Sequence, residues 1–147
     1  MAPPPPIENE LIKSFVGEWQ GTSQSPMGTS QDKVSYQLGL DGQFLMMQVE
    51  SKMGEQNMTG MGAATLMDGK LKGYWIDNYR MMAEGTGMIE GNKITMTWKM
   101  DQGTYTRTEE LIDDNTIKVM GKMETPDGNV MESTGKYTRI KAMTEKN

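Results

Sequence analysis

The chain has 147 residues and a formal net charge of −5, and it contains neither histidine nor cysteine. The length suits a single domain, and the missing residue types exclude disulfides, thiolate metal sites and a Ser-His-Asp triad. The acidic balance argues against nucleic acid as a partner, and no apolar run reaches the roughly 18 residues of a membrane helix. We therefore expect no nucleic-acid binding, no membrane insertion, no metal and no cofactor.

The N-terminal segment predicts a tail followed by one short helix. Residues 1–6 are rich in proline and predict a flexible tail, which is compatible with a cytoplasmic protein or with a trimmed exported one. Residues 8–16 place Leu11 and Phe15 four positions apart, as in an amphipathic helix. Gly17 ends this helix. A helix this short is marginal alone, so we expect it to dock as a lid on the rest of the fold.

Turn-forming residues recur along the remaining chain at intervals of roughly 10–15 residues, which is typical of short strands. Segments that short cannot contain helical crossovers, so consecutive strands must pair antiparallel. About ten strands in one sheet would leave two unpaired edges unless the sheet closed into a barrel. The expected strands are residues 18–25, 31–40, 43–52, 57–67, 70–77, 80–89, 93–100, 104–112, 116–124 and 130–140.

Alternating large apolar residues support these strands. The clearest rows are Ile94 to Met100 and Val34 to Leu40, in which every second side chain is large and apolar. Asp41-Gly42 and Asp68-Gly69 predict two-residue hairpin turns that need positive φ. We expect one barrel domain over residues 7–141, followed by a flexible tail over residues 142–147.

The first expected strand opens with Gly17-Glu18-Trp19-Gln20-Gly21. This motif resembles the Gly-x-Trp opening of lipocalin-like, or calycin, barrels. The resemblance implies that Trp19 closes the base of the barrel and that a basic residue of the last strand packs over its ring. Arg139 is in the right place for that cation–π contact. The expected fold is thus all-β: a single antiparallel up-and-down, lipocalin-like barrel of about ten strands with a short N-terminal helix.

A wider resemblance covers nearly the whole chain after residue 7. It is carried by the order and spacing of five short segments, which are residues 15–21, 40–45, 73–77, 126–128 and 137–139. Together they resemble an uncharacterised bacterial family, domain of unknown function 1579. That family is rich in methionine and often exported, and it implies a lipocalin-like fold without an established activity. The haem-binding nitrobindins have a similar shape, but they use an axial histidine, which this chain lacks.

Methionine is the compositional outlier, with 17 residues. Flexible, polarisable thioethers fill irregular cores and line promiscuous apolar pockets. A Cu(I) site and the scavenging of oxidants are the alternatives. Pairs such as Met58 and Met61 are three positions apart, so on a regular strand they face opposite sides and cannot chelate one ion. Filling of a core or pocket is the favoured interpretation.

The segment 104–112 raises a separate question about buried charge. If Tyr105 and Leu111 face inward, Arg107 and Glu109 do so as well, and buried charges are costly unless paired. Arg107 would then be a handle for the carboxylate of a ligand. In the alternative, threonines of this strand line a small polar interior and Arg107 covers the outside.

Three hypotheses about function follow from these patterns. The first is non-enzymatic binding of a small apolar or amphipathic molecule inside the barrel. The second is a structural or protein-interaction module with a filled interior, with a homodimer as a possible form, and the third is an enzyme that uses the barrel pocket. The missing catalytic residue types favour a protein that is not an enzyme. The candidate ligand-binding residues are Tyr36, Leu38, Met46, Trp75, Met96, Trp98, Arg107 and Tyr137.

Overall fold

The computed structural model describes residues 1–141. It contains one helix and ten strands, and every strand agrees with an expected segment to within three residues at each end. The elements are α1 (Glu10–Phe15), β1 (Gly17–Ser25), β2 (Gly28–Gly39), β3 (Phe44–Met53), β4 (Gln56–Met67), β5 (Lys70–Asp77), β6 (Met82–Glu90), β7 (Lys93–Met100), β8 (Gly103–Asp113), β9 (Thr116–Glu124) and β10 (Val130–Lys141).

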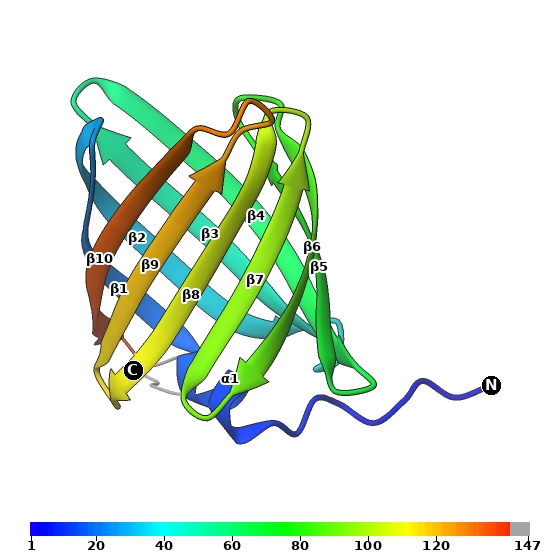
Figure 1. The fold of residues 1–147 in the computed structure, drawn as a ribbon. Helices are drawn as coiled ribbons and strands as arrows, with labels where there is room; N and C mark the ends of the chain where they lie inside the picture. Colours follow the sequence, from blue (N-terminus) through cyan, green and yellow to red (C-terminus); the bar gives the residue numbers. More distant parts are fainter. Residues whose placement is uncertain (142–147) are drawn as a thin grey trace.

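The strands form one closed barrel in which each strand pairs antiparallel with its neighbours in sequence, and β10 pairs with β1. Figure 1 shows the strands inclined to the barrel axis, with α1 beneath one end. Closure leaves no strand edge unpaired, which removes the hazard of edge-to-edge association. The predicted all-β, lipocalin-like barrel with a short helix is confirmed.

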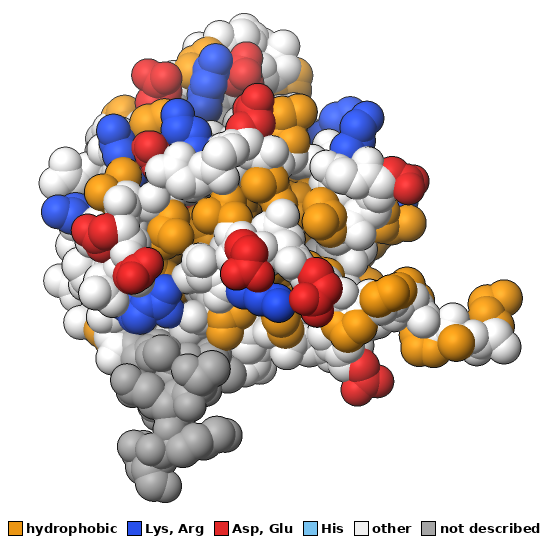
Figure 2. All heavy atoms as spheres, turned by 90° about the horizontal axis from the view of Figure 1, so that it is seen from below, with side chains coloured by type: hydrophobic (Ala, Val, Ile, Leu, Met, Phe, Trp, Pro, Cys, Tyr) orange, Lys and Arg blue, Asp and Glu red, His pale blue; other side chains and the backbone are white. Residues whose placement is uncertain are grey.

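Helix α1 closes one end of the barrel. Asn9 caps its N-terminus, because the Asn9 side chain accepts a hydrogen bond of 2.9 Å from the backbone of Ile12. Ile12 and Phe15 are fully buried, so the helix is fixed by the core and not by its own propensity. Figure 2 looks onto this end, where hydrophobic side chains gather in the middle of the face.

The last strand fastens this helix to the barrel. Arg139 donates hydrogen bonds from its guanidinium to the carbonyl oxygens of Val16 and Ser14, at 2.6 and 2.7 Å. These carbonyls belong to the end of α1, where they lack partners inside the helix. The same guanidinium donates to the Asp114 carbonyl at 2.9 Å, so one side chain joins α1, the β8–β9 turn and β10.

One turn differs from the sequence-based expectation. Asp68-Gly69 forms the expected two-residue turn, with φ of 53° and 78°. Asp41-Gly42 does not, since the link between β2 and β3 is a four-residue turn, 40–43, in which Leu40 also has a positive φ of 53°. Ile7 explains the longer turn, because its backbone N–H donates to the Gly42 carbonyl at 2.9 Å and ties the N-terminal segment to this corner.

Glycines of β4, β6 and β9 let aromatic rings of the neighbouring strands lie directly against the backbone. A Cβ on Gly85 would lie only 2.5 Å from the ring of Trp98, and a Cβ on Gly60 would overlap the ring of Trp75. Each indole therefore lies against the bare backbone of a neighbouring strand. Tyr105 covers Gly121 in the same way. Because these rings lie against the wall, they leave room for the charged side chains at the middle of the barrel.

Candidate functional site

A polar network crosses the inside of the barrel between β2 and β8. The Tyr36 hydroxyl donates to the Glu109 carboxylate at 2.6 Å, and Arg107 contacts both Glu109 and Tyr137. Tyr137 in turn donates to Asp32 at 2.7 Å. The network divides the interior into a small apolar cavity on the α1 side and a larger cavity that opens at the opposite end of the barrel.

Asp32 is the most heavily hydrogen-bonded member of this network. Ser30 and Ser51 donate to one carboxylate oxygen, and Ser23 and Tyr137 donate to the other, at 2.7–2.9 Å. Burial alone would raise the pKa of Asp32, but these hydroxyls hold the pKa below its ordinary value. Asp32 is therefore a buried carboxylate that stays ionised, with both oxygens already occupied.

Arg107 and Glu109 form the charged pair of the network. Nε and Nη2 of Arg107 donate to the same Glu109 oxygen, at 3.2 and 3.1 Å. Burial works against the charge of Arg107, but Glu109 and the nearby tyrosines raise its pKa well above the ordinary value. Burial, followed by the negative charge of Glu109, raises the pKa of Tyr36 well above its ordinary value, so Tyr36 remains a proton donor.

The cavity on the α1 side is small and almost entirely apolar. Its volume is about 50 Å³, which is too little for more than a few water molecules. Arg107 and Glu109 form its only charged boundary among the described residues. Its other lining residues are Ile12, Phe15, Tyr36, Leu45, Met47, Ala64, Leu71, Ile94, Met96 and Trp98.

The cavity at the opposite end is open to solvent and has a volume of about 340 Å³. That volume lies at the lower end of the range for pockets that bind small organic molecules. Asp32, Arg107 and Tyr137 form its floor, and serines of β1 to β3 line one side. Four methionines from four different strands also line it, and these are Met53, Met58, Met123 and Met131.

Arg107 borders both cavities, and one nitrogen of its guanidinium, Nη1, is not used by the network. About a quarter of its side chain is exposed, although its partner Glu109 is buried. Its recorded hydrogen bonds use Nε and Nη2 only. Within residues 1–141, Nη1 has no protein acceptor, and no buried side-chain nitrogen or oxygen is left without a partner. Nη1 can therefore donate to water or to a molecule in the cavity.

The structure brings most of the sequence-predicted ligand residues inside the barrel but divides them between the two cavities. Tyr36, Met96 and Trp98 line the small cavity, Tyr137 lines the open one, and Arg107 borders both. The charges of strand β8 thus face inward, and the alternative in which Arg107 covers the outside is wrong.

Three other predicted residues line neither cavity. Met46 lies on the outer face, where a Cβ on Gly39 would meet it, and its neighbour Met47 faces inward instead. The reason is the pairing of Leu38 with Leu45, which places the odd-numbered residues of β3 inside. Leu38 packs at the edge of the core. Trp75 packs on glycines of β4, and its indole N–H donates to Asp77 at 3.0 Å.

Sequence reasoning missed Asp32 and its serines, although a signal was present. Asp32 lies on the same alternating row as Val34 and Tyr36, and a row that is apolar at one end must place Asp32 inside as well. Ser30 continues that row toward the open end. The polar half of the barrel was hidden because serine is also common in turns and on surfaces.

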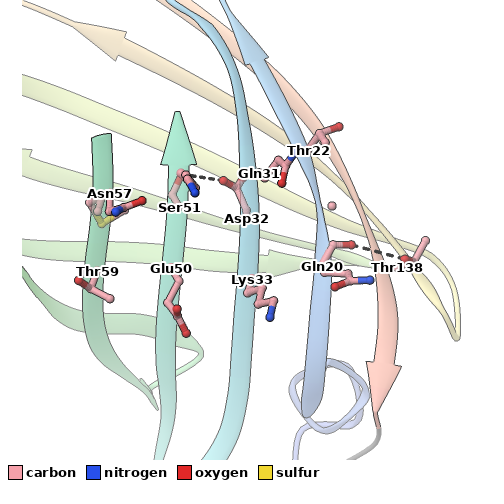
Figure 3. Close-up of a pocket in the computed structure, with 13 residues that line it drawn as sticks. Gln20, Thr22, Gln31, Asp32, Lys33, Glu50, Ser51, Asn57, Thr59 and Thr138 are labelled. Carbon is pink, nitrogen blue, oxygen red and sulfur yellow. Dashed lines mark hydrogen bonds between the residues drawn. The ribbon is translucent and has the colours of Figure 1, made fainter. Parts of the chain in front are cut away.

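The outer surface also carries hollows, and Figure 3 shows one of them. It lies over the outer side of β10 and β1 to β4 and is lined by outward polar side chains, including Gln20, Lys33, Glu50 and Thr59. Its side chains are mostly polar and carry charges of both signs. Asp32 and Ser51 of the interior network also border it, but Arg107, Glu109 and the two tyrosines of the network do not, so we do not place the site there.

An exposed apolar row crosses three strands of the outer face. Met61 of β4 pairs with Ile76 of β5, which pairs with Met82 of β6, and the three are 42 to 76% exposed. A homodimer through such a face remains a prediction.

No helix within the described residues is long and apolar enough to cross a membrane. Residues 1–141 contain no group of three or more acidic side chains that could hold a metal.

Comparison with solved structures shows the same fold in two other proteins. The S-type phycobiliprotein lyase CPES from Guillardia theta superposes with a TM-score of 0.63 at 12% identity, covering 92% of this chain and 93% of the lyase. A protein of unknown function from the DUF3598 family of Nostoc punctiforme superposes with a TM-score of 0.60 at 14% identity. The match covers 88% of this chain and 48% of the Nostoc punctiforme protein. No known family model matches the chain, and no curated protein matches it.

These comparisons correct one expectation and leave another open. The prediction that the protein is not an enzyme is overturned, because a barrel of this fold is a lyase. Membership of the family of domain of unknown function 1579 stays a prediction, since no family model matches. At these identities the likeness shows the fold alone: a lipocalin-like barrel.

Proposed function

We propose that the protein binds a small apolar or amphipathic molecule in the open end of its barrel, with the polar end of that molecule at Arg107. The observation that carries the proposal is the cavity of about 340 Å³ with a partly exposed arginine at its floor. Methionines suit a ligand of irregular apolar shape, because thioether side chains adapt their conformation at low cost.

The division of the interior supports the same location. The α1 end is filled by Ile12, Phe15 and Trp19, each fully buried, and only about 50 Å³ remains free above them. A ligand of more than a few atoms therefore has room at the open end and not beneath the network. Of the residues predicted from the sequence to contact a ligand, Arg107 and Tyr137 line this cavity and are retained here, and Met53, Met58, Met123 and Met131 replace the others as apolar contacts.

Binding in this cavity is the step that a carrier and an enzyme would share. The likeness to a lyase supports a barrel that receives another molecule, and no described side chain is assigned a catalytic role. The proposal therefore holds whether the protein releases the bound molecule unchanged or converts it to a product.

A neutral fluorescent dye tests the proposal directly. Nile red should bind saturably, with a blue-shifted and brighter emission, because it moves from water into an apolar cavity. Met123→Trp should weaken this binding by filling the open end, whereas Met120→Trp should not. Met120 lies on the same strand but is outward and 46% exposed, so it is a matched control. Absence of saturable binding, or equal effects of both variants, would refute the proposal.

A further inference from the structure

The charge balance inside the barrel limits what the polar end of a ligand can be. Four charged residues line the two cavities, and Arg107 is the only basic one among them. Asp32 and Glu109 are buried acids, and Glu132 is an exposed acid of the open end. The interior therefore carries one positive charge against two buried negative charges, before any ligand arrives.

The positive charge of Arg107 is already paired with the negative charge of Glu109. Glu109 takes two of its donors onto one oxygen, at 3.1 and 3.2 Å, and Tyr137 takes a third contact at 3.3 Å. The Tyr137 hydroxyl in turn donates its hydrogen bond to Asp32. A single hydroxyl group therefore links the guanidinium of Arg107 to the carboxylate of Asp32. Nη1 thus offers hydrogen bonds to a ligand without offering a net attraction for a second anion.

An uncharged hydrogen-bond acceptor and a carboxylate should bind beside Nη1 of Arg107 with different affinities. A carbonyl oxygen accepts from Nη1 and adds no charge to a poorly solvated interior. A carboxylate accepts the same hydrogen bonds but adds a third negative charge beside Asp32 and Glu109, and like charges in such a site repel strongly. The carboxylate must also give up its own hydration.

We infer that the site selects amphipathic molecules with an uncharged hydrogen-bond-accepting head group, such as an amide, ester or ketone, over carboxylates. The inference rests on the proposed function, since it names the class of molecule that this cavity takes. It also replaces the sequence-based idea that Arg107 is a handle for a carboxylate: the arginine is a handle, but its charge is balanced within the barrel.

Two probes of equal chain length test the selectivity. Decanamide and decanoate should each be titrated against bound Nile red at pH 8, where decanoate is ionised. The amide should displace the dye at a concentration at least about tenfold lower than decanoate, as expected for one unfavourable juxtaposition of like charges. Tighter binding of decanoate would overturn the inference and leave the proposed function standing. Failure of Nile red itself to bind would instead refute the proposed function.

A variant that removes the charge of Glu109 tests whether this charge causes the preference for decanamide over decanoate. Glu109→Gln keeps the shape and one hydrogen-bonding oxygen but releases the charge of Arg107, so the affinity for decanoate should rise at least about tenfold while that for decanamide changes little. Glu110→Gln is the matched control, because Glu110 neighbours Glu109 on β8 and pairs across the strands with the exposed Lys118, outside the lumen. Equal responses of the two variants would overturn the inference.

A second variant keeps the test decisive if Glu109→Gln does not fold, as judged by circular dichroism. Asp32→Asn removes the other buried negative charge and should raise the affinity for decanoate in the same direction. A folded Asp32→Asn protein with an unchanged preference for decanamide over decanoate would overturn the inference.

Discussion

The guanidinium of Arg139 lies over the indole ring of Trp19, 4.2 Å from the ring centre, at the point where the last strand of the barrel pairs with the first. The indole N–H donates to the Phe15 carbonyl at 2.9 Å, and the ring is fully buried. The two residues therefore hold together the ends of the domain and the helix that closes it, through a cation–π contact and hydrogen bonds to backbone carbonyls.

Loss of either partner should destabilise the barrel. Trp19→Ala should lower the free energy of unfolding by about 3–5 kcal/mol, as truncation of a buried large aromatic does. Arg139→Met should cost about 1–3 kcal/mol, since it removes the donors to Ser14 and Val16. Urea unfolding followed by tryptophan fluorescence measures both. Arg80→Met changes an exposed arginine of the β5–β6 turn and is the control; an equal loss in both arginine variants would contradict the assigned role of Arg139.

The acid limb of stability should depend on Asp32. Its pKa is lowered in the folded protein, so its contribution is complete above the unfolded value of about 4 and is lost as the pH falls through the lower folded pKa. Asp32→Asn should therefore lose stability at neutral pH and show a shallower further loss below about pH 4. Urea midpoints measured from pH 7 to 2 test this. Parallel curves for the two proteins would show that Asp32 does not titrate with folding.

The alkaline limb should depend on the two buried tyrosines. The pKa values of Tyr36 and Tyr137 are raised, so the stability that they contribute is present below about pH 10 and is lost as the pH rises from there toward the folded pKa values. Absorbance at alkaline pH should show Tyr36 and Tyr137 ionising late, together with unfolding. Tyr36→Phe should leave one late tyrosine; five tyrosines that titrate together near pH 10 in the folded protein would contradict the buried network.

The contact between Gly85 and Trp98 predicts that substitutions at these two positions have coupled effects on stability. Gly85→Ala should destabilise the protein because its Cβ would lie 2.5 Å from the Trp98 ring. In a Trp98→Phe background the same substitution should cost less, since the smaller ring leaves space. A double-mutant cycle in urea should give a coupling energy of about 0.5–3 kcal/mol, as for other residues in contact. Additive effects would show that the ring does not depend on the bare backbone.

How far the sequence reveals this barrel differs between its backbone and its interior. Turn residues such as Asp68-Gly69 and the alternating row around Trp98 determine where strands begin and end, because both signals are local. The Met46-Met47 pair misled the register by one residue, since two identical neighbours carry no difference in polarity. The structure resolves it through the pairing of β3 with β2.

The network was harder to foresee, because its partners are far apart in sequence. Tyr36 and Glu109 are 73 positions apart, and Asp32 and Tyr137 are 105 apart. Alternation shows that a charged side chain points inward, but not which hydroxyl or carboxylate it meets across the barrel. The sequence therefore raised Arg107 as a handle without revealing that Glu109 balances its charge, and this balance decides the class of ligand that we propose.

The N-terminal segment predicts a sharp boundary between residues that stabilise the fold and residues that do not. Gln43 donates to the Pro4 carbonyl at 2.7 Å in an exposed setting, whereas Ile7 is only 8% exposed and belongs to the core. Deletion of residues 1–6 should therefore change the free energy of unfolding by no more than about 1 kcal/mol.

Ile7→Ala in the full-length chain should cost about 2 kcal/mol or more, because it removes buried apolar atoms beneath the turn at Gly42. Thermal unfolding of the two proteins beside the parent provides the comparison. A deletion as damaging as Ile7→Ala would mean that the proline segment packs on the barrel and is part of the domain. Since the parent, the deletion and the substitution share every residue of the open cavity, Nile red binding should be equal in all three at temperatures where each is folded.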